Sequence, residues 1–114
     1  MVIQRMSAHS PQEFAVSTVT SFELYTGVAK CAQPVKERTK VDRFLIAVEE
    51  LPFDSSAARE AARLRALLES QGQMIGPYDI LLAGQAVAAD LVLVTNNVAE
   101  FRRVPGLRFE DWQT

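Results

Sequence analysis

Several polar side chains of this 114-residue chain have the types and spacing of a metal site. They follow two short apolar segments, FAVS (14–17) and LVLVT (91–95), or begin the helix that leads to the second one: Thr20, Glu23, Asp79, Thr95, Asn96, Asn97 and Glu100. In α/β sheets, ligands bind at the carboxyl ends of the strands. Carboxylate and amide oxygens suit the hard cations Mg²⁺ and Mn²⁺. The pattern therefore predicts that Glu23, Asp79 and one asparagine of the 96–97 pair converge on a divalent cation.

Each of these residues also has an ordinary structural interpretation. Asp79 in a first helical turn favours the helix dipole by about 0.3–1 kcal/mol. Glu23 fits a solvated helix position, and the asparagine pair after a strand fits a turn, because Asn tolerates left-handed backbone. The metal-site interpretation, unlike the structural one, holds the carboxylates close together. Carboxylates held together without a cation repel each other, so one of them is expected to keep its proton.

Other chemistries find less support in the sequence. His9 has no second histidine or cysteine nearby, which argues against zinc and against a catalytic triad. The five glycines are isolated, so no phosphate-binding glycine loop is present. Cys31 is the single cysteine and cannot form an internal disulfide. Arg102 and Arg103 lie close in sequence to the acidic candidates and are the favoured contacts for a phosphate.

Length and composition indicate one globular domain over residues 1–114. Hydrophobic residues make up 48% and charged residues 23% of the chain, close to the globular average. The net charge is −2, so contact with nucleic acid requires a local basic patch. The longest apolar run, residues 80–89, falls short of the roughly 20 residues that span a bilayer. No secretory segment is evident, and a cytoplasmic location without membrane contact is expected.

Short apolar strands alternating with helices predict an α/β domain with a mostly parallel sheet. The expected strands are 14–17, 51–53, 91–95 and 107–109, the last at an edge of the sheet. The expected helices are 21–32, 33–50, 56–72, 77–89 and a short one within 96–104. In helix 56–72, six residues are expected to face inward: Ala58, Ala61, Ala62, Leu64, Leu67 and Leu68.

Two segments, VSTVTSFELYTGVAK (16–30) and residues 72–112, resemble the PIN-domain ribonucleases, specifically the VapC toxins of bacterial toxin–antitoxin pairs. The resemblance implies a three-layer α/β/α fold and a Mg²⁺ or Mn²⁺ centre that hydrolyses RNA. It places Glu23, Asp79 and Asn97 at the catalytic metal site. Further residues would support that site or contact RNA phosphate: Thr20, Thr95, Asn96, Glu100, Arg102 and Arg103. The implied partners are a VapB-type antitoxin, whose tail blocks the site, and a second copy in a homodimer.

One departure from the family concerns the N-terminus. The family opens with a central strand ending in an Asp-Thr-Asn-like triplet, whose Asp is a principal metal ligand. Here MVIQRM (1–6) instead resembles the helical region beyond that strand. We therefore expect two carboxylates instead of three at the metal, a sheet without its middle strand, and weak activity. Truncation of an intact toxin is the favoured explanation, over a misassigned start, a degenerate toxin or a strand supplied by another chain.

Two further hypotheses remain from other functional classes. The chain could be a non-catalytic PIN-like remnant that still binds an antitoxin or a second subunit. It could also be an unrelated α/β phospho-acceptor or nucleotide-binding domain. The last hypothesis is the weakest, because LVLVT (91–95) leads into Asn-Asn, whereas a phospho-acceptor fold has a carboxylate directly at a strand end.

Overall fold

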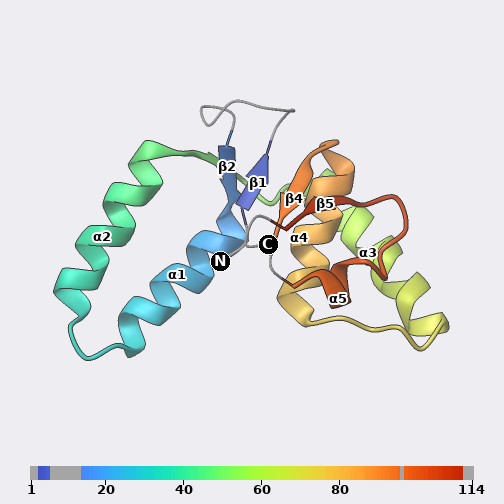
Figure 1. The fold of residues 1–114 in the computed structure, drawn as a ribbon, viewed down its shortest axis with the longest axis horizontal. Coiled ribbons are helices and arrows are strands. Elements are labelled where there is room, and N and C mark those ends of the chain that lie inside the picture. The colour runs from blue at the N-terminus through green and yellow to red at the C-terminus, as the bar shows by residue number, and fades with distance from the viewer. Residues whose placement is uncertain (1–2, 6–13, 96, 112–114) are drawn as a thin grey trace.

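The computed structural model describes residues 3–5, 14–95 and 97–111 (Figure 1). The described strands form one sheet in the order β3-β2-β1-β4-β5. The strands are β1 (Ile3–Arg5), β2 (Phe14–Ser17), β3 (Glu49–Leu51), β4 (Val92–Val94) and β5 (Arg108–Glu110). The helices are α1 (Thr18–Lys30), α2 (Pro34–Ala47), α3 (Ser55–Ser70), α4 (Pro77–Ala88) and α5 (Val98–Phe101). The predicted α/β fold is confirmed, with β5 at an edge as expected.

The middle of the sheet is occupied by β1. It pairs antiparallel with both β2 and β4, and Gln4 lies opposite Ala15 on one side and Leu93 on the other. The pairs β2–β3 and β4–β5 are parallel. The helical expectation for the first residues is therefore wrong for Ile3–Arg5, and so is the expectation of a sheet without a middle strand, because β1 fills that place. A strand here gives hydrogen-bond partners to the facing backbone edges of β2 and β4, which would otherwise be unpaired.

The direction of β1 determines which of its ends lies at the edge of the sheet where β2 and β4 end. Because β1 is antiparallel to both neighbours, β2 and β4 run in the same direction and their carboxyl ends lie at one edge of the sheet. Ile3, the first residue of β1, pairs with Val94, the last residue of β4. The middle strand thus reaches this edge with its amino end. Among the described residues, no carboxylate follows a middle strand there.

The hydrophobic core lies between the sheet and the α3–α4 pair. Its main residues come from α3, α4, β4 and α5: Leu64, Leu68, Ile80, Leu82, Leu93 and Phe101. Gly84 permits the close packing of the two helices, since a Cβ atom at this position would lie 2.5 Å from the backbone of Ala61. Gln85 is buried beside it and donates from Nε2 to the carbonyl oxygen of Leu51 at 3.2 Å. That bond fastens the end of β3 to α4.

Helix α3 buries a narrower stripe than the sequence predicted. Its buried residues are Ala57, Ala61, Leu64 and Leu68, which recur at the spacing of one helical face. Ala58 and Ala62 are exposed, so the expectation that they face inward is wrong. Both lie one position beyond a buried alanine, about 100° around the helix from it. The stripe facing α4 is therefore built from small side chains at its start and leucines at its end.

Local capping chemistry sets several element boundaries. The Oγ of Ser17 accepts a hydrogen bond from the N–H of Val19 at 3.0 Å, so α1 begins directly after β2, three residues earlier than expected. Helix α2 begins at Pro34, as predicted. The third strand ends at Leu51, whereas the sequence placed it at 51–53. Pro52 has no N–H to donate to a sheet ladder.

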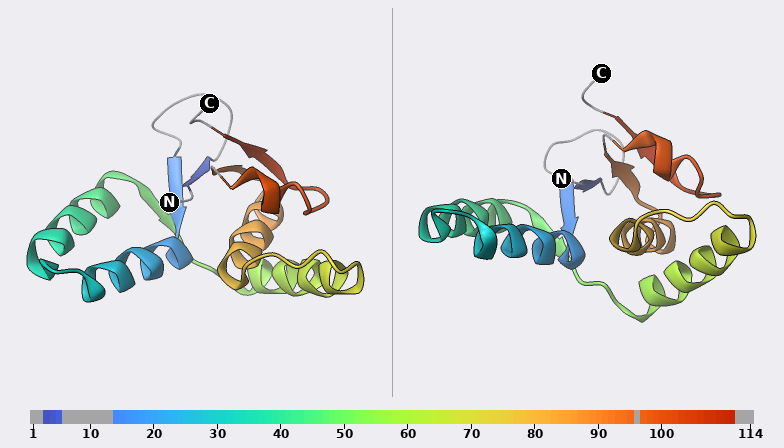
Figure 2. Two further views of the ribbon diagram at one scale, coloured as in Figure 1. Left: turned by 60° about the horizontal axis from the view of Figure 1, so that its bottom comes forward. Right: turned by 90° about the horizontal axis from the view of Figure 1, so that it is seen from below.

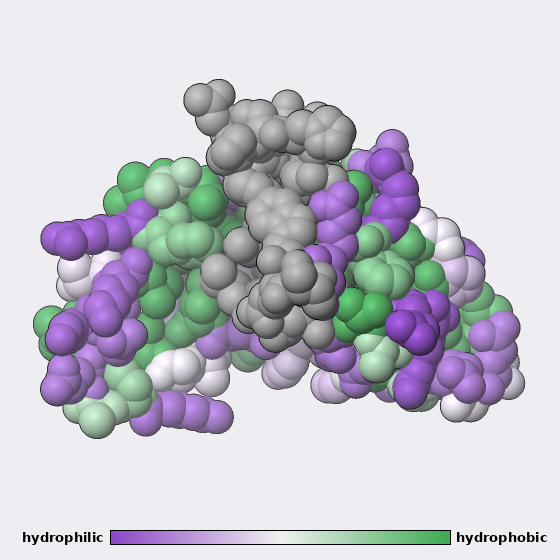
Figure 3. Space-filling view, in the orientation of Figure 1, coloured by the Kyte–Doolittle hydropathy of each residue, from purple (hydrophilic) through white to green (hydrophobic). Residues whose placement is uncertain are grey.

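The α1–α2 pair extends from one side of the strands, while α3 and α4 lie on the other (Figures 1 and 2). Helix α2 has no buried residue, and Val35 near its start is 83% exposed. Apolar side chains are visible over this pair on the molecular surface (Figure 3). Within the described part of the chain, no helix is long and apolar enough to cross a membrane.

Candidate active site

Asp79 and Glu100 form the centre of the candidate site. Asp79 lies in the first turn of α4, which begins at Pro77, a residue whose missing N–H costs nothing at that position. Glu100 lies in α5, which follows β4 after a short turn. Both helices therefore place a carboxylate at the edge where β4 ends. The two side chains are joined by a hydrogen bond.

The two carboxyl groups have opposite pKa shifts. Burial, followed by the hydrogen bond to Glu100 and the charges of Glu100 and Glu23, raises the pKa of Asp79 to about 7. The same hydrogen bond is the main cause that lowers the pKa of Glu100. The protonated carboxyl of Asp79 thus donates to the Glu100 carboxylate. Crowded carboxylates without a cation behave in this way, as the charge argument from the sequence predicted.

Gly76 packs directly against this pair. A Cβ atom at this position would lie 3.1 Å from Oδ2 of Asp79 and 3.8 Å from Oε2 of Glu100. The backbone N–H of Gly76 also donates to Glu100, which helps to lower the pKa of that carboxyl. A larger residue would have to push the carboxylates aside. The sequence signal was the Gly-Pro step that begins the helix, which was interpreted only as a helix start.

Asn97 and Thr95 shape the turn between β4 and α5. Nδ2 of Asn97 donates to Oε2 of Glu100 at 2.9 Å, and its backbone N–H donates to Oγ1 of Thr95 at 2.9 Å. Thr95 is buried, and its own N–H donates to the carbonyl oxygen of Glu110 at 3.0 Å. The turn is thereby held to β5, and the Asn97 side chain orients Glu100. Asn96 lies outside the described residues.

Glu23 approaches the site from the opposite half of the molecule. It lies on α1, which begins at the carboxyl end of β2, and its side chain is exposed. Its charge contributes to the raised pKa of Asp79. Thr20, one turn earlier, is buried and packs at the base of the helix. The structure therefore brings Glu23, Asp79 and Asn97 to the same edge. It joins Asp79 and Asn97 through Glu100, which was predicted only as a supporting residue.

The two arginines differ in their surroundings. Both Arg102 and Arg103 are exposed just after α5. Nη1 of Arg103 donates to the carbonyl oxygen of Met74 at 2.8 Å, which ties this segment to the loop before α4. The charge of Arg103 also lowers the pKa of Glu100. Arg103 therefore has a structural and electrostatic contribution of its own, whereas Arg102 extends from the same surface beside it.

The donor chemistry of the pair fits a hard divalent cation. Asp79 and Glu100 present carboxyl oxygens in hydrogen-bond contact, and burial, followed by the interaction with Glu100, raises the pKa of Asp79. Among the described residues, however, no three acidic, histidine or cysteine side chains lie close enough together to hold a metal ion. The site thus supplies two adjoining carboxylates, with Asn97 on one side and Glu23 further away across the edge.

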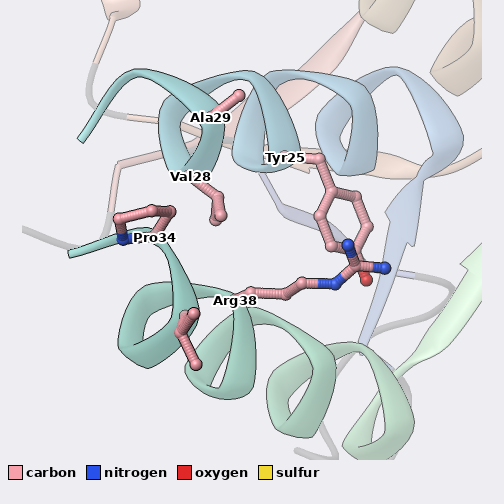
Figure 4. A pocket seen from close by; sticks show the side chains of 6 residues that line it. Tyr25, Val28, Ala29, Pro34 and Arg38 are labelled. Carbon is pink, nitrogen blue, oxygen red and sulfur yellow. The ribbon is translucent and has the colours of Figure 1, made fainter. Parts of the chain in front are cut away.

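A second surface feature is an apolar hollow of about 460 Å³ between α1 and α2 (Figure 4). It is lined by residues of both helices: Tyr25, Val28, Ala29, Pro34, Val35 and Arg38. The guanidinium of Arg38 lies 5.8 Å from the centre of the Tyr25 ring. The Tyr25 hydroxyl donates to Asp42 on α2, and this bond raises the pKa of the tyrosine. The hollow is formed by a different pair of elements from the carboxylate site.

Comparisons with known proteins place this geometry among the PIN domains. A family model described as PIN domain matches residues 3–107. The chain is 41% identical over 97 residues to a tRNA(fMet)-specific endonuclease VapC of Salmonella typhimurium, covering 85% of this chain and 74% of that protein. It is 39% identical to a protein of the same name from Shigella flexneri, covering 88% of this chain and 76% of that protein.

Solved structures give the same result. One is described as DNA-bound VapBC from Salmonella typhimurium, with a TM-score of 0.84 and 41% identity. That match covers 86% of this chain and 74% of the other. VapBC2 from Rickettsia felis, bound to a promoter DNA fragment, has a TM-score of 0.84 at 37% identity, covering 87% of this chain and 74% of the other.

Proposed function

Because this chain belongs to the VapC family of PIN-domain proteins, we propose that it is a metal-dependent endoribonuclease that hydrolyses RNA phosphodiester bonds. The observation that supports this proposal most directly is the hydrogen-bonded pair of Asp79 and Glu100, oriented by Asn97 and influenced by the charge of Glu23. Two carboxylates that share a proton at neutral pH form a site where a divalent cation can replace that proton. The proposed ion is Mg²⁺ or Mn²⁺.

In this proposal, Asp79 and Glu100 hold the cation, with Asn97 and Glu23 completing the polar surroundings. A bound divalent ion supplies charge stabilisation at the phosphate and lowers the pKa of a water molecule. Asn97 fixes the rotamer of Glu100 through its 2.9 Å hydrogen bond. Glu23, exposed on α1, would accept a hydrogen bond from the attacking water and so orient it. Arg102 and Arg103 contact the RNA phosphates on either side of the cut.

The proposed substrate follows from the relatives. Two of them, at 41% and 39% identity, are named tRNA(fMet)-specific endonucleases. We take tRNA(fMet) as the first RNA to test, with ribosomal and messenger RNA as comparisons. The proposed location is the cytoplasm, where that substrate occurs.

The proposed partner is a VapB-type antitoxin. The structures similar to this chain include VapBC complexes, and one of them is described as a member of the VapBC family of toxin–antitoxin systems. The apolar hollow between α1 and α2 offers a place for an apolar segment of such a partner, since Val35 there is 83% exposed. Blocking of the carboxylate site by an antitoxin tail and pairing of two copies into a homodimer are further parts of this proposal.

The test is cleavage of 3′-labelled tRNA(fMet) by the purified chain with Mg²⁺ or Mn²⁺, against a reaction containing EDTA. Asp79→Asn should reduce the rate at least 100-fold, because it removes a carboxylate from the metal site. Glu69→Gln, on an exposed face of α3, is the matched control and should retain the parental rate. Cleavage that persists in EDTA, or at full rate in Asp79→Asn, would reject the mechanism.

A second candidate function is a non-catalytic module that binds an antitoxin or another subunit. The observation that favours it is the lack, among the described residues, of three ligands grouped for a metal. It predicts that the chain forms a stable complex with a VapB-type antitoxin and leaves every RNA intact with either cation. Size-exclusion chromatography of the mixture, together with the cleavage assay, separates the two functions.

A further inference from the structure

Two aromatic side chains contact each other beside the candidate site. Phe22 on α1 and Tyr78 on α4 have ring centroids 5.5 Å apart and planes tilted by 51°. Each directly precedes a carboxylate of the site, since Phe22 comes before Glu23 and Tyr78 before Asp79. The pair therefore connects the two halves of the molecule at the same edge where the carboxylates lie.

The exposure of this pair is unusual within the molecule. Phe22 is 53% exposed and Tyr78 is 45% exposed, although aromatic rings bury more area than most side chains. Among the aromatic residues whose side chains the structure describes, these two are the largely exposed ones. The other described aromatic side chains, Tyr25, Phe44, Phe53, Phe101 and Phe109, are buried or half-buried. The exposed rings thus gather at one place, next to Glu23 and Asp79.

We propose that Phe22 and Tyr78 form a stacking platform for an unpaired nucleobase of the RNA, next to the phosphodiester that is cut. This inference rests on the proposed ribonuclease function and specifies how that site holds its substrate. A flat base has two apolar faces, so it can stack on one of the rings, with the other ring at an angle of 51° beside it. Stacking of bases on aromatic side chains is a common means of binding single strands.

The exposed arginines after α5 favour a phosphate-bearing strand over a peptide as the occupant. Glu23 and Asp79 directly follow the two aromatic residues in the chain, so a phosphate needs a cation to approach the carboxylates there. Arg102 and Arg103 follow Glu100 closely in the chain, are exposed and can hold the flanking phosphates. A stacked base would hold the RNA strand between the carboxylates and the arginines. It would thereby place one phosphodiester at the carboxylates. The platform would then select single-stranded over double-stranded RNA, because paired bases do not expose their faces.

The experiment measures binding of a fluorescein-labelled single-stranded RNA 12-mer and its duplex to the full chain by anisotropy, with Ca²⁺ in place of Mg²⁺ or Mn²⁺. Phe22→Leu and Tyr78→Leu keep apolar contact between α1 and α4 but remove the flat rings. Each should weaken single-strand binding about five-fold to a hundred-fold, the range for loss of one stacked base. Tyr78→Phe and Phe22→Tyr should bind like the parent. Ile46→Ala, which removes an 85% exposed apolar side chain on α2, is the surface control.

A second readout separates stacking from a structural effect. A series of 12-mers, each with one abasic position, is bound to the parent and to Tyr78→Leu. At the stacked position, removal of the base should weaken binding to the parent and leave the affinity of Tyr78→Leu unchanged. A general loosening of the fold would instead weaken binding at every position. Thermal unfolding midpoints of the leucine variants complete the comparison.

The outcomes are distinct. If the parent neither binds nor cleaves RNA, the proposed function and the platform are both rejected. If the parent binds and cleaves RNA while the leucine variants match it, the platform is rejected and the proposed function stands. If the leucine variants lose antitoxin binding and keep their RNA affinity, the pair is a protein-binding surface, and the platform is likewise rejected.

Discussion

Asp79 and Glu100 hold one proton between them in a hydrogen bond that spans the start of α4 and the short helix α5. Burial of Asp79 is the largest cause of its raised pKa, and the Glu100 carboxylate is the second. The pair is therefore stable in its protonated form near pH 7 and becomes repulsive above it. Four expected outcomes concern this carboxyl pair, the contact between α3 and α4 and the proposed RNA surface, in addition to the tests of the proposals above.

The first concerns stability against pH in the absence of metal. Asp79 has a pKa of about 7 in the folded chain and an ordinary value of 3.8. Between these values the folded state holds a proton that the unfolded state has lost. The free energy of unfolding should therefore fall as the pH rises from about 4 to 7 and change little from this cause above that range. Asp79→Asn should flatten this dependence.

The measurement is urea unfolding in EDTA at half-unit steps from pH 5 to pH 8. Glu100 does not contribute to the pH dependence between pH 5 and pH 8, because its pKa is lowered from 4.5. Glu69→Gln provides the control for removing an exposed carboxylate. Parallel curves for the parent and Asp79→Asn would show that Asp79 titrates normally.

The second outcome concerns divalent cations. Mg²⁺ or Mn²⁺ should raise the unfolding temperature, with a gain of about 2.7 kcal/mol at a hundred times the dissociation constant. The shift should be larger at pH 8 than at pH 6, because the cation competes with the proton on Asp79. Asp79→Asn and Glu100→Gln should each lose most of the shift in differential scanning fluorimetry. An equal shift in all three proteins would place cation binding elsewhere.

The third outcome concerns the contact between α3 and α4. A Cβ atom on Gly84 would lie 2.5 Å from Cα, Cβ and N of Ala61, so Gly84→Ala should destabilise the chain by about 1–3 kcal/mol or more. Gly27 is the matched control within a helix, since nothing lies within 4 Å of its Cβ position. Gly27→Ala should stabilise by about 0.5–1 kcal/mol. Chemical unfolding of both variants gives the comparison, and equal changes would contradict the close helix contact.

The fourth outcome concerns Arg102. If it contacts one RNA phosphate, Arg102→Ala should reduce the slope of log affinity against log salt by about 0.7, the value for one contact on a single strand. Arg59→Ala, on the exposed face of α3, should leave the slope unchanged. Binding of the RNA 12-mer at four salt concentrations measures both. A slope identical to that of the parent would remove Arg102 from the RNA surface.

Residues whose contribution is local were predictable from the sequence. Pro77 begins α4 and Asp79 lies in its first turn as expected, because each of these depends on its immediate neighbours in the chain. The edge at which the polar side chains gather also followed from the alternation of strands and helices. The resemblance to PIN domains, stated from two segments, is confirmed by the matched family model.

Features that depend on contacts distant in sequence were not predictable in the same way. Glu100 contacts Asp79 across 21 positions of the sequence, and its place after the strand 91–95 predicted only a supporting position for it. Strand β1 forms because two facing edges need partners, a demand that Ile3–Arg5 alone does not express. The end of β3 is held by Gln85, which donates to the carbonyl oxygens of Leu51 and Pro52 from a helix 34 positions away.

The short middle strand β1 helps to set the distance between the two groups of candidate site residues. Glu23 and Phe22 belong to the half built from β2, α1, α2 and β3, whereas Asp79, Glu100 and Tyr78 belong to the half built from α3, α4, β4, α5 and β5. Within the described sheet, these halves are joined through the three residues of β1. The separation of Glu23 from Asp79 is therefore set by the contacts that join the two halves: the pairing of β1, the Phe22–Tyr78 ring contact and the hydrogen bonds from Gln85 to Leu51 and Pro52.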